Sequence, residues 1–225
     1  MRYDVVLADL DDTLLDFSAS ARQALTDFLE SRGLAATEEK IERYEAINRG
    51  WWERFERGEI PREDIFPGRF TDFFEALGIS GDPLEANRYY MDHLCQKRNL
   101  IPGARELLGR IHPHCEICLI SNGVGSTQRP RIRDSGLGPF LDRIFLSEDV
   151  GFQKPDRRFF DCVFSEIGGE KRPRSIVLGD SLTSDMLGGR NAGLATCFFG
   201  DPARADGRCD YVITDLLEFP EILGL

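Results

Sequence analysis

The sequence has no apolar run long enough to span a membrane, because its hydrophobic residues, 41% of the total, occur in short segments. It also shows no basic leader, no separate apolar leader segment and no small-residue cleavage site at its start. We therefore expect a cytoplasmic protein that does not associate with membranes. Six cysteines are too few and too scattered for a disulfide scaffold, so we expect reduced thiols that are mostly buried.

Positive charge is also scarce, since 28 Lys and Arg residues stand against 39 Asp and Glu residues, giving a net charge of −11. The resulting field repels a nucleic-acid polymer or an anionic membrane surface, and we expect neither as a partner. A small phosphate ester remains compatible with this charge, because a metal ion or a lysine can reverse the potential locally. The 225 residues fit one large domain, or a core domain with an insertion.

The order of the expected elements indicates an α/β fold. Residues 3–9 contain an apolar run, "VVLA" (5–8), without polar alternation, which is typical of a strand buried on both faces of a parallel sheet. Between about residues 18 and 95 the patterns are helical only, and Thr37, followed by two glutamates, is a typical helix start. After residue 100 helices alternate with strands. The expected strands are 116–121, 140–147, 175–180, 194–199 and 211–214, and the expected helices are 102–111, 126–136, 156–167, 184–192 and 215–223.

Alternation of this kind predicts a doubly wound parallel sheet, Rossmann-like, with right-handed crossovers. The first strand would then pair with strands that all lie after residue 100. The intervening segment of roughly 80 residues is too long to be a loop. We therefore predict an α/β core domain made of residues 1–16 and 97–225, with residues 17–96 inserted as an all-helical domain.

Polar residues gather where the expected strands end. In a doubly wound sheet, ligands bind at the carboxyl ends of the strands. The first strand ends in "DLDDT" (9–13), the second in "SNG" (121–123) and the fourth in "GDS" (179–181), with Asp185 close behind. A further loop, "EDVGFQKPD" (148–156), carries Lys154. The four segments should meet at one edge of the sheet.

The carboxylates in these segments have the chemistry of a magnesium site. Asp9 and Asp11 are two residues apart, so in extended backbone their side chains project to the same side. Together with Asp180 they would place three carboxylates around one point. Oxygen ligands favour a hard cation, and few protein ligands with room for water favour Mg²⁺ over Ca²⁺.

The remaining groups suit a phosphate. The Ser121 hydroxyl, the backbone N–H groups around Asn122 and Gly123, and the Lys154 ammonium are all donors to phosphate oxygens. A carboxylate facing a phosphoryl group can act as a nucleophile and form an aspartyl phosphate. A second carboxyl two residues further on can protonate the leaving oxygen and then deprotonate the attacking water.

The motifs "DLDDT", "ISNG", "KPD" and "GDSLTSD", in this order and at these strand ends, resemble the haloacid-dehalogenase-like (HAD) phosphohydrolase superfamily. The resemblance covers nearly the whole chain, because the helical insertion looks like the helical cap of that family. It implies a Mg²⁺-dependent phosphomonoesterase with an aspartyl-phosphate intermediate. By this resemblance Asp9 is the nucleophile and a metal ligand, and Asp11 is the general acid/base whose main-chain carbonyl also binds the metal. Asp180 is a further metal ligand, and Asp185 and Thr13 support the site. The residues that bind the phosphate are Ser121, Asn122 and Lys154.

Two further stretches, "AINRGWWERFERGEI…PGRF" in the insertion and "GGRNAGLATC" in the core, are similar to the YjjG-type pyrimidine 5′-nucleotidases. This likeness implies a pyrimidine nucleoside 5′-monophosphate as substrate. Of the two tryptophans, one is expected to pack in the helical core, and Trp52 is a candidate for stacking on a base. Asn48 and Arg69 are further candidates for substrate contact.

Two local patterns have simpler interpretations. The Asp12 side chain is expected to shape the turn after the first strand rather than to bind a ligand. His112, His114, Cys115 and Cys118 resemble a zinc site only superficially. The two cysteines would point to opposite faces of a strand, and no second Cys/His pair completes four ligands.

Other functions fit parts of the pattern. A phosphatase for phosphoglycolate or a sugar phosphate, and a sugar-phosphate mutase, would use the same groups. A dehalogenase shares the fold, but there the position of Asp11 is not an acid and no Mg²⁺ is needed. A phosphorylatable receiver-like signalling module also uses clustered carboxylates, but it lacks the long insertion and has its phosphoacceptor on a later strand. Either a monomer or a homodimer is compatible with the sequence.

Overall fold

The computed structural model describes residues 2–225, which form two compact units. One unit comprises the chain up to Phe17 together with Arg98–Leu225, and the other is Ser18–Lys97. The domain limits predicted from the sequence, at residues 16/17 and 96/97, lie one residue away from these limits. We call the two parts the α/β unit and the helical unit. No helix among residues 2–225 is both long and apolar enough to cross a membrane.

A six-stranded sheet in the order β3-β2-β1-β4-β5-β6 forms the centre of the α/β unit, and every pair of neighbours is parallel. The predicted doubly wound fold is confirmed. Its strand order reverses between β1 and β4, the position where such sheets bind their ligands. The strands are β1 (Val5–Ala8), β2 (Glu116–Ser121), β3 (Arg143–Leu146), β4 (Ser175–Gly179), β5 (Ala195–Phe199) and β6 (Tyr211–Ile213).

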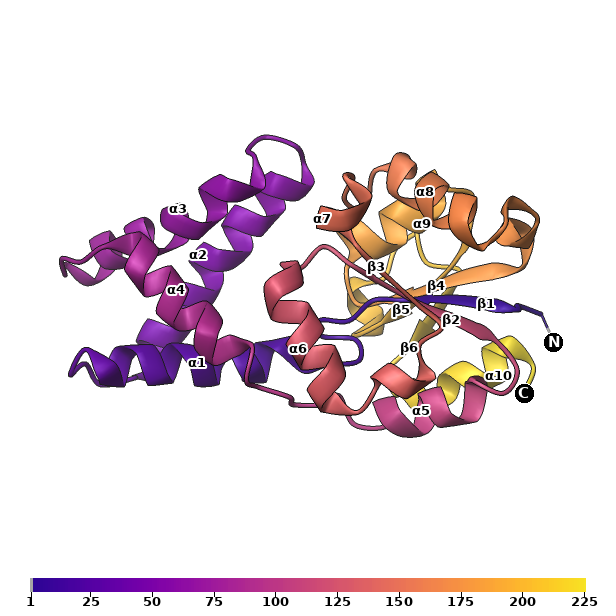
Figure 1. Cartoon of the computed structure of the whole chain (residues 1–225), viewed down its shortest axis with the longest axis horizontal. Helices are drawn as coiled ribbons and strands as arrows, with labels where there is room; N and C mark the ends of the chain where they lie inside the picture. Colours follow the sequence, from indigo (N-terminus) through magenta and orange to yellow (C-terminus); the bar gives the residue numbers. More distant parts are fainter. Residues whose placement is uncertain (1) are drawn as a thin grey trace. The chain divides into compact units, whose positions relative to one another are not determined.

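Helices cover both faces of this sheet, with α5 and α10 on one side and α8 and α9 on the other (Figure 1). Successive residues of β1 alternate between two cores: Val6 and Ala8 pack with α5, whereas Val5 and Leu7 pack with α8. Burial on both faces explains the unbroken apolar run at the start of the sequence. The α-helices of the unit are α5 (Ala104–Ile111), α6 (Gly125–Ser135), α7 (Ser147–Val150), α8 (Arg157–Ile167), α9 (Leu187–Asn191) and α10 (Phe219–Leu223).

Two predicted helices are divided in the structure. Residues 184–192 were expected as one helix, but a π-helical turn, Leu182–Met186, precedes α9. The Ser181 side chain accepts the N–H of Ser184 and so starts that turn earlier than expected. Similarly, a 3₁₀ turn, Leu216–Glu218, precedes α10.

The helical unit is built from four helices around an aromatic core. Thr37 is the N-cap of α2, as the sequence predicts, and Gly78 ends α3 in the left-handed conformation. The helices are α1 (Phe17–Ser31), whose first residue belongs to the α/β unit, α2 (Glu38–Glu56), α3 (Arg62–Leu77) and α4 (Pro83–Leu94). Their buried rings, in contact with one another, are Phe28, Tyr44, Phe70, Phe73, Phe74 and Tyr90.

Candidate active site

Asp9 and Lys154 form a buried ion pair at the carboxyl end of β1. The Asp9 N–H donates to the carbonyl of Leu178 on β4 at 2.9 Å, which continues the sheet for one residue beyond the strand. Its carboxylate accepts a hydrogen bond from Lys154 Nζ at 2.5 Å. The same ammonium donates to Asp185 Oδ1 at 2.6 Å and to the carbonyl of Ile120 at 3.1 Å. Lys154 therefore has an oxygen acceptor for each of its three N–H groups.

The backbone of Lys154 is fixed by Asn122, the residue directly after β2. The Asn122 amide donates to the Lys154 carbonyl at 2.8 Å, and its carbonyl oxygen accepts the Lys154 N–H at 2.9 Å. The side chain of Asn122 is thus committed to holding the lysine loop. Its expected contact with phosphate would have to use its backbone N–H.

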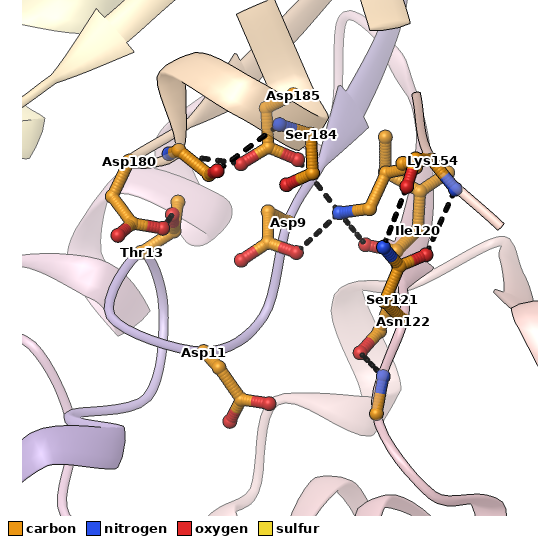
Figure 2. Close-up of polar contacts among 12 residues, drawn as sticks. Asp9, Asp11, Thr13, Ile120, Ser121, Asn122, Lys154, Asp180, Ser184 and Asp185 are labelled. Atoms are coloured by element: carbon orange, nitrogen blue, oxygen red, sulfur yellow. Dashed lines mark hydrogen bonds and ion pairs between the residues drawn. The ribbon is translucent and has the colours of Figure 1, made fainter. Parts of the chain in front are cut away.

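Three carboxylates surround one point in this site: oxygens of Asp9, Asp180 and Asp185 all lie within 4.8 Å of one another. In Figure 2 Asp9 and Asp185 lie beside Lys154, Asp180 lies on their far side from the lysine, and the Asp11 carboxylate is directed away from the group. Thr13 Oγ1 donates to Asp180 Oδ1 at 3.3 Å. The sequence pattern predicted Asp11 as the third side chain, but Asp185 takes that place. β1 ends at Ala8, so the alternation of an extended strand no longer applies at Asp11.

Gly179 allows Asp185 to reach this cluster. A Cβ atom at Gly179, the last residue of β4, would lie 2.4 Å from the Asp185 carboxyl carbon. The Asp185 carboxylate also accepts the backbone N–H of Ser181 at 3.1 Å. A side chain at position 179 would therefore displace the carboxylate that supports Lys154.

The electrostatics of the cluster favour a bound cation. Burial raises the pKa of Asp9 to about 8, and this rise persists although Lys154 opposes it. Burial, followed by repulsion from Asp9 and Asp185, also raises the pKa of Asp180 well above its ordinary value. Burial disfavours the charged form of Lys154, but attraction to Asp185 and Asp9 outweighs it and raises the lysine pKa. One ammonium does not offset two buried carboxylates and a third that is half-buried.

Asp11 has different partners, on helix α6. Its carboxylate oxygens accept hydrogen bonds from Gln128 Nε2 and from Arg131 NH1, the latter at 2.5 Å. Gln128 Nε2 also donates to Ser121 Oγ at 3.2 Å. Our sequence interpretation missed both α6 residues. Their spacing of three, on the helix that follows Ser121, places them on one helix face and was an available signal.

Asp12 lies in the turn after β1, and its backbone accounts for the turn. Its backbone is in the left-handed region with φ of 58°, which aspartate tolerates better than most residues. Its N–H donates to the carbonyl of Leu15 at 2.7 Å. The expected opposite orientation of Cys115 and Cys118 is also found, because the two side chains lie in the cores on opposite faces of the sheet.

The candidate substrate residues lie in the helical unit. Arg69 is 2% exposed and donates to Asn48 Oδ1 at 2.9 Å and to Asn87 Oδ1 at 2.6 Å. Trp52 is half-buried and packs edge-on against Phe55. The structure thus pairs Asn48 with Arg69 and places Trp52 in a separate contact.

Comparison with known proteins identifies the family. A family model described as haloacid dehalogenase-like hydrolase matches residues 3–193. The chain belongs to this family. It is therefore a hydrolase, and the resemblance predicted from the strand-end motifs is confirmed. The HAD motifs of the sequence coincide with the cluster around Asp9 and Lys154.

Individual relatives cover most of this HAD hydrolase. The HAD-hydrolase YfnB of Bacillus subtilis is 38% identical over 88% of this chain and 84% of its own length. The pyrimidine 5′-nucleotidases PynA of Streptococcus pneumoniae and YjjG of Escherichia coli are 33% and 32% identical, over 88% of this chain and 84% and 86% of their own. A magnesium-bound crystal structure of YfnB matches with a TM-score of 0.94 at 36% identity, over 100% of both chains.

Proposed function

We propose that this HAD hydrolase is a Mg²⁺-dependent phosphomonoesterase that acts through an aspartyl phosphate, with pyrimidine nucleoside 5′-monophosphates as substrates. The observation that carries the proposal is the buried Asp9–Lys154 pair within a cluster of three carboxylates, at the switch point of the sheet. The pyrimidine preference is supported by the likeness to PynA and YjjG.

The chain's own groups fit a magnesium ion. The cluster offers only carboxylate oxygens, and the raised pKa values of Asp9 and Asp180 reflect repulsion and burial that a divalent cation relieves. Asp9, Asp180 and the main-chain carbonyl of Asp11 would hold the ion. When bound, it would neutralise negative charge on the transferring phosphoryl group.

The reaction would proceed in two steps at Asp9. An Asp9 carboxylate oxygen attacks phosphorus, the bond from phosphorus to the ester oxygen breaks, and the Asp11 carboxyl gives its proton to that leaving oxygen. Water then attacks the phosphorus of the aspartyl phosphate while the Asp11 carboxylate takes a proton from it. Inorganic phosphate leaves and Asp9 is restored. Ser121 and Lys154 would hold phosphate oxygens in both steps.

The helical unit would act as the cap domain that selects the substrate. Arg69 supports this role, since it is a buried cation whose hydrogen bonds go to neutral oxygens and to the Met91 sulfur. A pyrimidine presents carbonyl oxygens that such a donor recognises. Asn48 and Trp52 are proposed as further contacts, with Trp52 available for stacking on a base.

A phosphate-release screen tests the proposal. Purified protein is assayed with Mg²⁺ against nucleoside monophosphates, sugar phosphates and phosphoglycolate, and again with EDTA. We expect turnover that requires Mg²⁺ and is highest for UMP or TMP. Preference for phosphoglycolate or a sugar phosphate would remove the nucleotidase assignment, and metal-independent turnover would remove the role of Mg²⁺.

The same screen, extended to measure isomer formation and halide release, separates the remaining alternatives. A mutase would convert a sugar phosphate into its isomer without stoichiometric release of phosphate. A receiver-like module would accept one phosphoryl group and lose it slowly instead of turning over. Dehalogenase activity would release halide from a 2-haloacid without Mg²⁺.

A further inference from the structure

Gln128 and Arg131 form a two-donor clamp on Asp11. Each carboxylate oxygen of Asp11 accepts from one of these side chains: Oδ2 from Gln128 Nε2 and Oδ1 from Arg131 NH1. Arg131 NH1 also donates to Gln128 Oε1 at 2.8 Å, so the two clamp residues orient each other. They lie three positions apart on α6, on one face of the helix.

Packing around the clamp leaves little freedom. Arg131 is 0% exposed and Gln128 2%. The guanidinium carbon of Arg131 lies 5.7 Å from the centre of the Phe17 ring. A Cβ atom at Gly123 would lie 2.1 Å from Gln128 Nε2, so the absence of a side chain there makes room for the amide.

Helix packing alone does not account for Arg131. Its Nε and NH2 atoms are buried without a hydrogen-bond partner among the described residues, and its NH1 atom forms an ion pair with Asp11. Burying a guanidinium with unsatisfied donors costs several kcal/mol, and an apolar side chain of similar volume is often at least as stable. The arrangement therefore indicates a role other than stability.

Gln128 links Asp11 to the proposed phosphate site. Its Nε2 donates both to Asp11 and to Ser121 Oγ, and Ser121 Oγ in turn accepts the Gly123 N–H at 3.0 Å. The Gln128 amide thus contacts both the Asp11 carboxylate and the Ser121 hydroxyl. A movement of either group would be transmitted to the other.

We infer that Gln128 and Arg131 are positioning residues that set the place and orientation of the Asp11 carboxylate for proton transfer to and from the substrate. This inference rests on the proposed function for the identity of the reaction. Neither residue needs to touch the substrate. Their effect would appear in steps that require a proton from Asp11.

The dependence of rate on the leaving group tests the inference. A leaving nucleoside alkoxide needs a proton in the transition state, whereas p-nitrophenolate is a weak base that leaves with little help. In Arg131→Met and Gln128→Met we expect kcat/KM for UMP to fall ~10-fold or more beyond the fall for p-nitrophenyl phosphate. Phenyl phosphate should be intermediate, and Arg131→Lys should recover part of the loss.

Two controls distinguish positioning from a structural role. Arg133→Met makes the same change on the same helix at an exposed residue paired with Asp134, and should leave the substrate ratio unchanged. In an Asp11→Asn background, Arg131→Met should alter the ratio less than about twofold, because the group that it positions no longer transfers a proton. Equal falls in kcat/KM for UMP, phenyl phosphate and p-nitrophenyl phosphate would overturn the inference. So would an undiminished effect of Arg131→Met on the substrate ratio in the Asp11→Asn background.

Structure determination keeps the test independent of activity. In crystals of Gln128→Met and Arg131→Met the Asp11 carboxylate should leave its wild-type place while Asp9 and Lys154 stay. An unmoved Asp11 overturns the inference even if the wild-type enzyme proves to hydrolyse no phosphate ester, an outcome that would separately refute the proposed function. If Arg131→Met does not fold, the neutral exchange Gln128→Met decides the question.

Discussion

Each unit buries one arginine deeply, and the two arginines have different partners. Arg131 in the α/β unit contacts a carboxylate, Asp11. Arg69 in the helical unit contacts two asparagine oxygens, a thioether sulfur and the faces of aromatic rings, the nearest being Tyr90 with its centre at 4.9 Å. The α/β unit thus opposes its buried cations with its own carboxylates, whereas the helical unit leaves a cation among neutral groups. We expect the cations paired with carboxylates in the α/β unit to govern the reaction rate, and Arg69 in the helical unit to govern substrate preference.

The largest expected effect is at the nucleophile of the α/β unit. Asp9→Asn should lower phosphate release by ~10⁴-fold or more, because an amide cannot form the acyl phosphate. Circular dichroism should report an unchanged fold. Asp12→Asn is the matched control, since Asn also tolerates the left-handed backbone at that position, and it should stay within a few-fold of wild type. Near-normal turnover by Asp9→Asn would show that another group is the nucleophile.

The second effect concerns compensation of charge in the α/β unit. Lys154→Met leaves Asp9 and Asp185 buried without their cation and should lower the free energy of unfolding by about 3 kcal/mol in EDTA, measured by urea denaturation. Lys97→Met breaks a partly exposed pair with Asp27 and should cost less than about 1 kcal/mol. Equal losses in the two variants would contradict the contrast between a buried and an exposed pair.

The third effect addresses the helical unit. Arg69→Met should lower kcat/KM for UMP ~10-fold, mainly through KM, and leave that for p-nitrophenyl phosphate within about threefold. Stability should change by less than about 1 kcal/mol or increase, because the substitution removes a buried cation that has no carboxylate partner. Arg88→Met, at an exposed position of α4, provides the comparison. Equal falls in kcat/KM for UMP and p-nitrophenyl phosphate would show that Arg69 supports folding rather than substrate selection.

The smallest effect is the pH dependence of metal binding. Burial raises the pKa of Asp9 to about 8, so the metal-free folded protein binds a proton there more tightly than the unfolded chain does. The contribution of this group to stability is therefore lost as pH rises from about 4 toward about 8, and Mg²⁺ competes with fewer protons at the upper end. Saturating Mg²⁺ should raise Tm by several degrees more at pH 8.5 than at pH 6. Asp180→Asn should remove most of this difference, and an equal shift at both pH values would argue against a metal held by these carboxylates.

The cluster around Lys154 was predictable because each member follows a strand or a loop at the same sheet edge. Carboxyl ends of parallel strands converge whatever the intervening sequence is, so Asp9 and Asp180 were placed in the cluster from their positions alone, whereas Asp185 takes the place predicted for Asp11. The direction of the Asp11 side chain was not predictable in this way. Asp12 turns the chain through a left-handed conformation immediately after it, and that turn depends on contacts beyond the strand.

The partners of Asp11 and Arg69 could not be predicted from the sequence, for a different reason. The spacing of Gln128 and Arg131 defines a helix face, but the group that this face meets is more than 100 residues earlier in the chain. The Asn48–Arg69 bond likewise joins two helices whose relative rotation no periodicity specifies. Local pattern therefore identifies which residues share a face, and tertiary packing decides what that face contacts.

The two hydrogen bonds between Asn122 and the backbone of Lys154 have a consequence for how this enzyme can diverge. They fix the lysine to the end of β2 from a residue of another segment, so its position does not depend on the course of residues 148–153. Substitutions and changes of length in that stretch can accumulate without displacing the ammonium. The position of the Lys154 ammonium is thereby made independent of much of the loop that carries it.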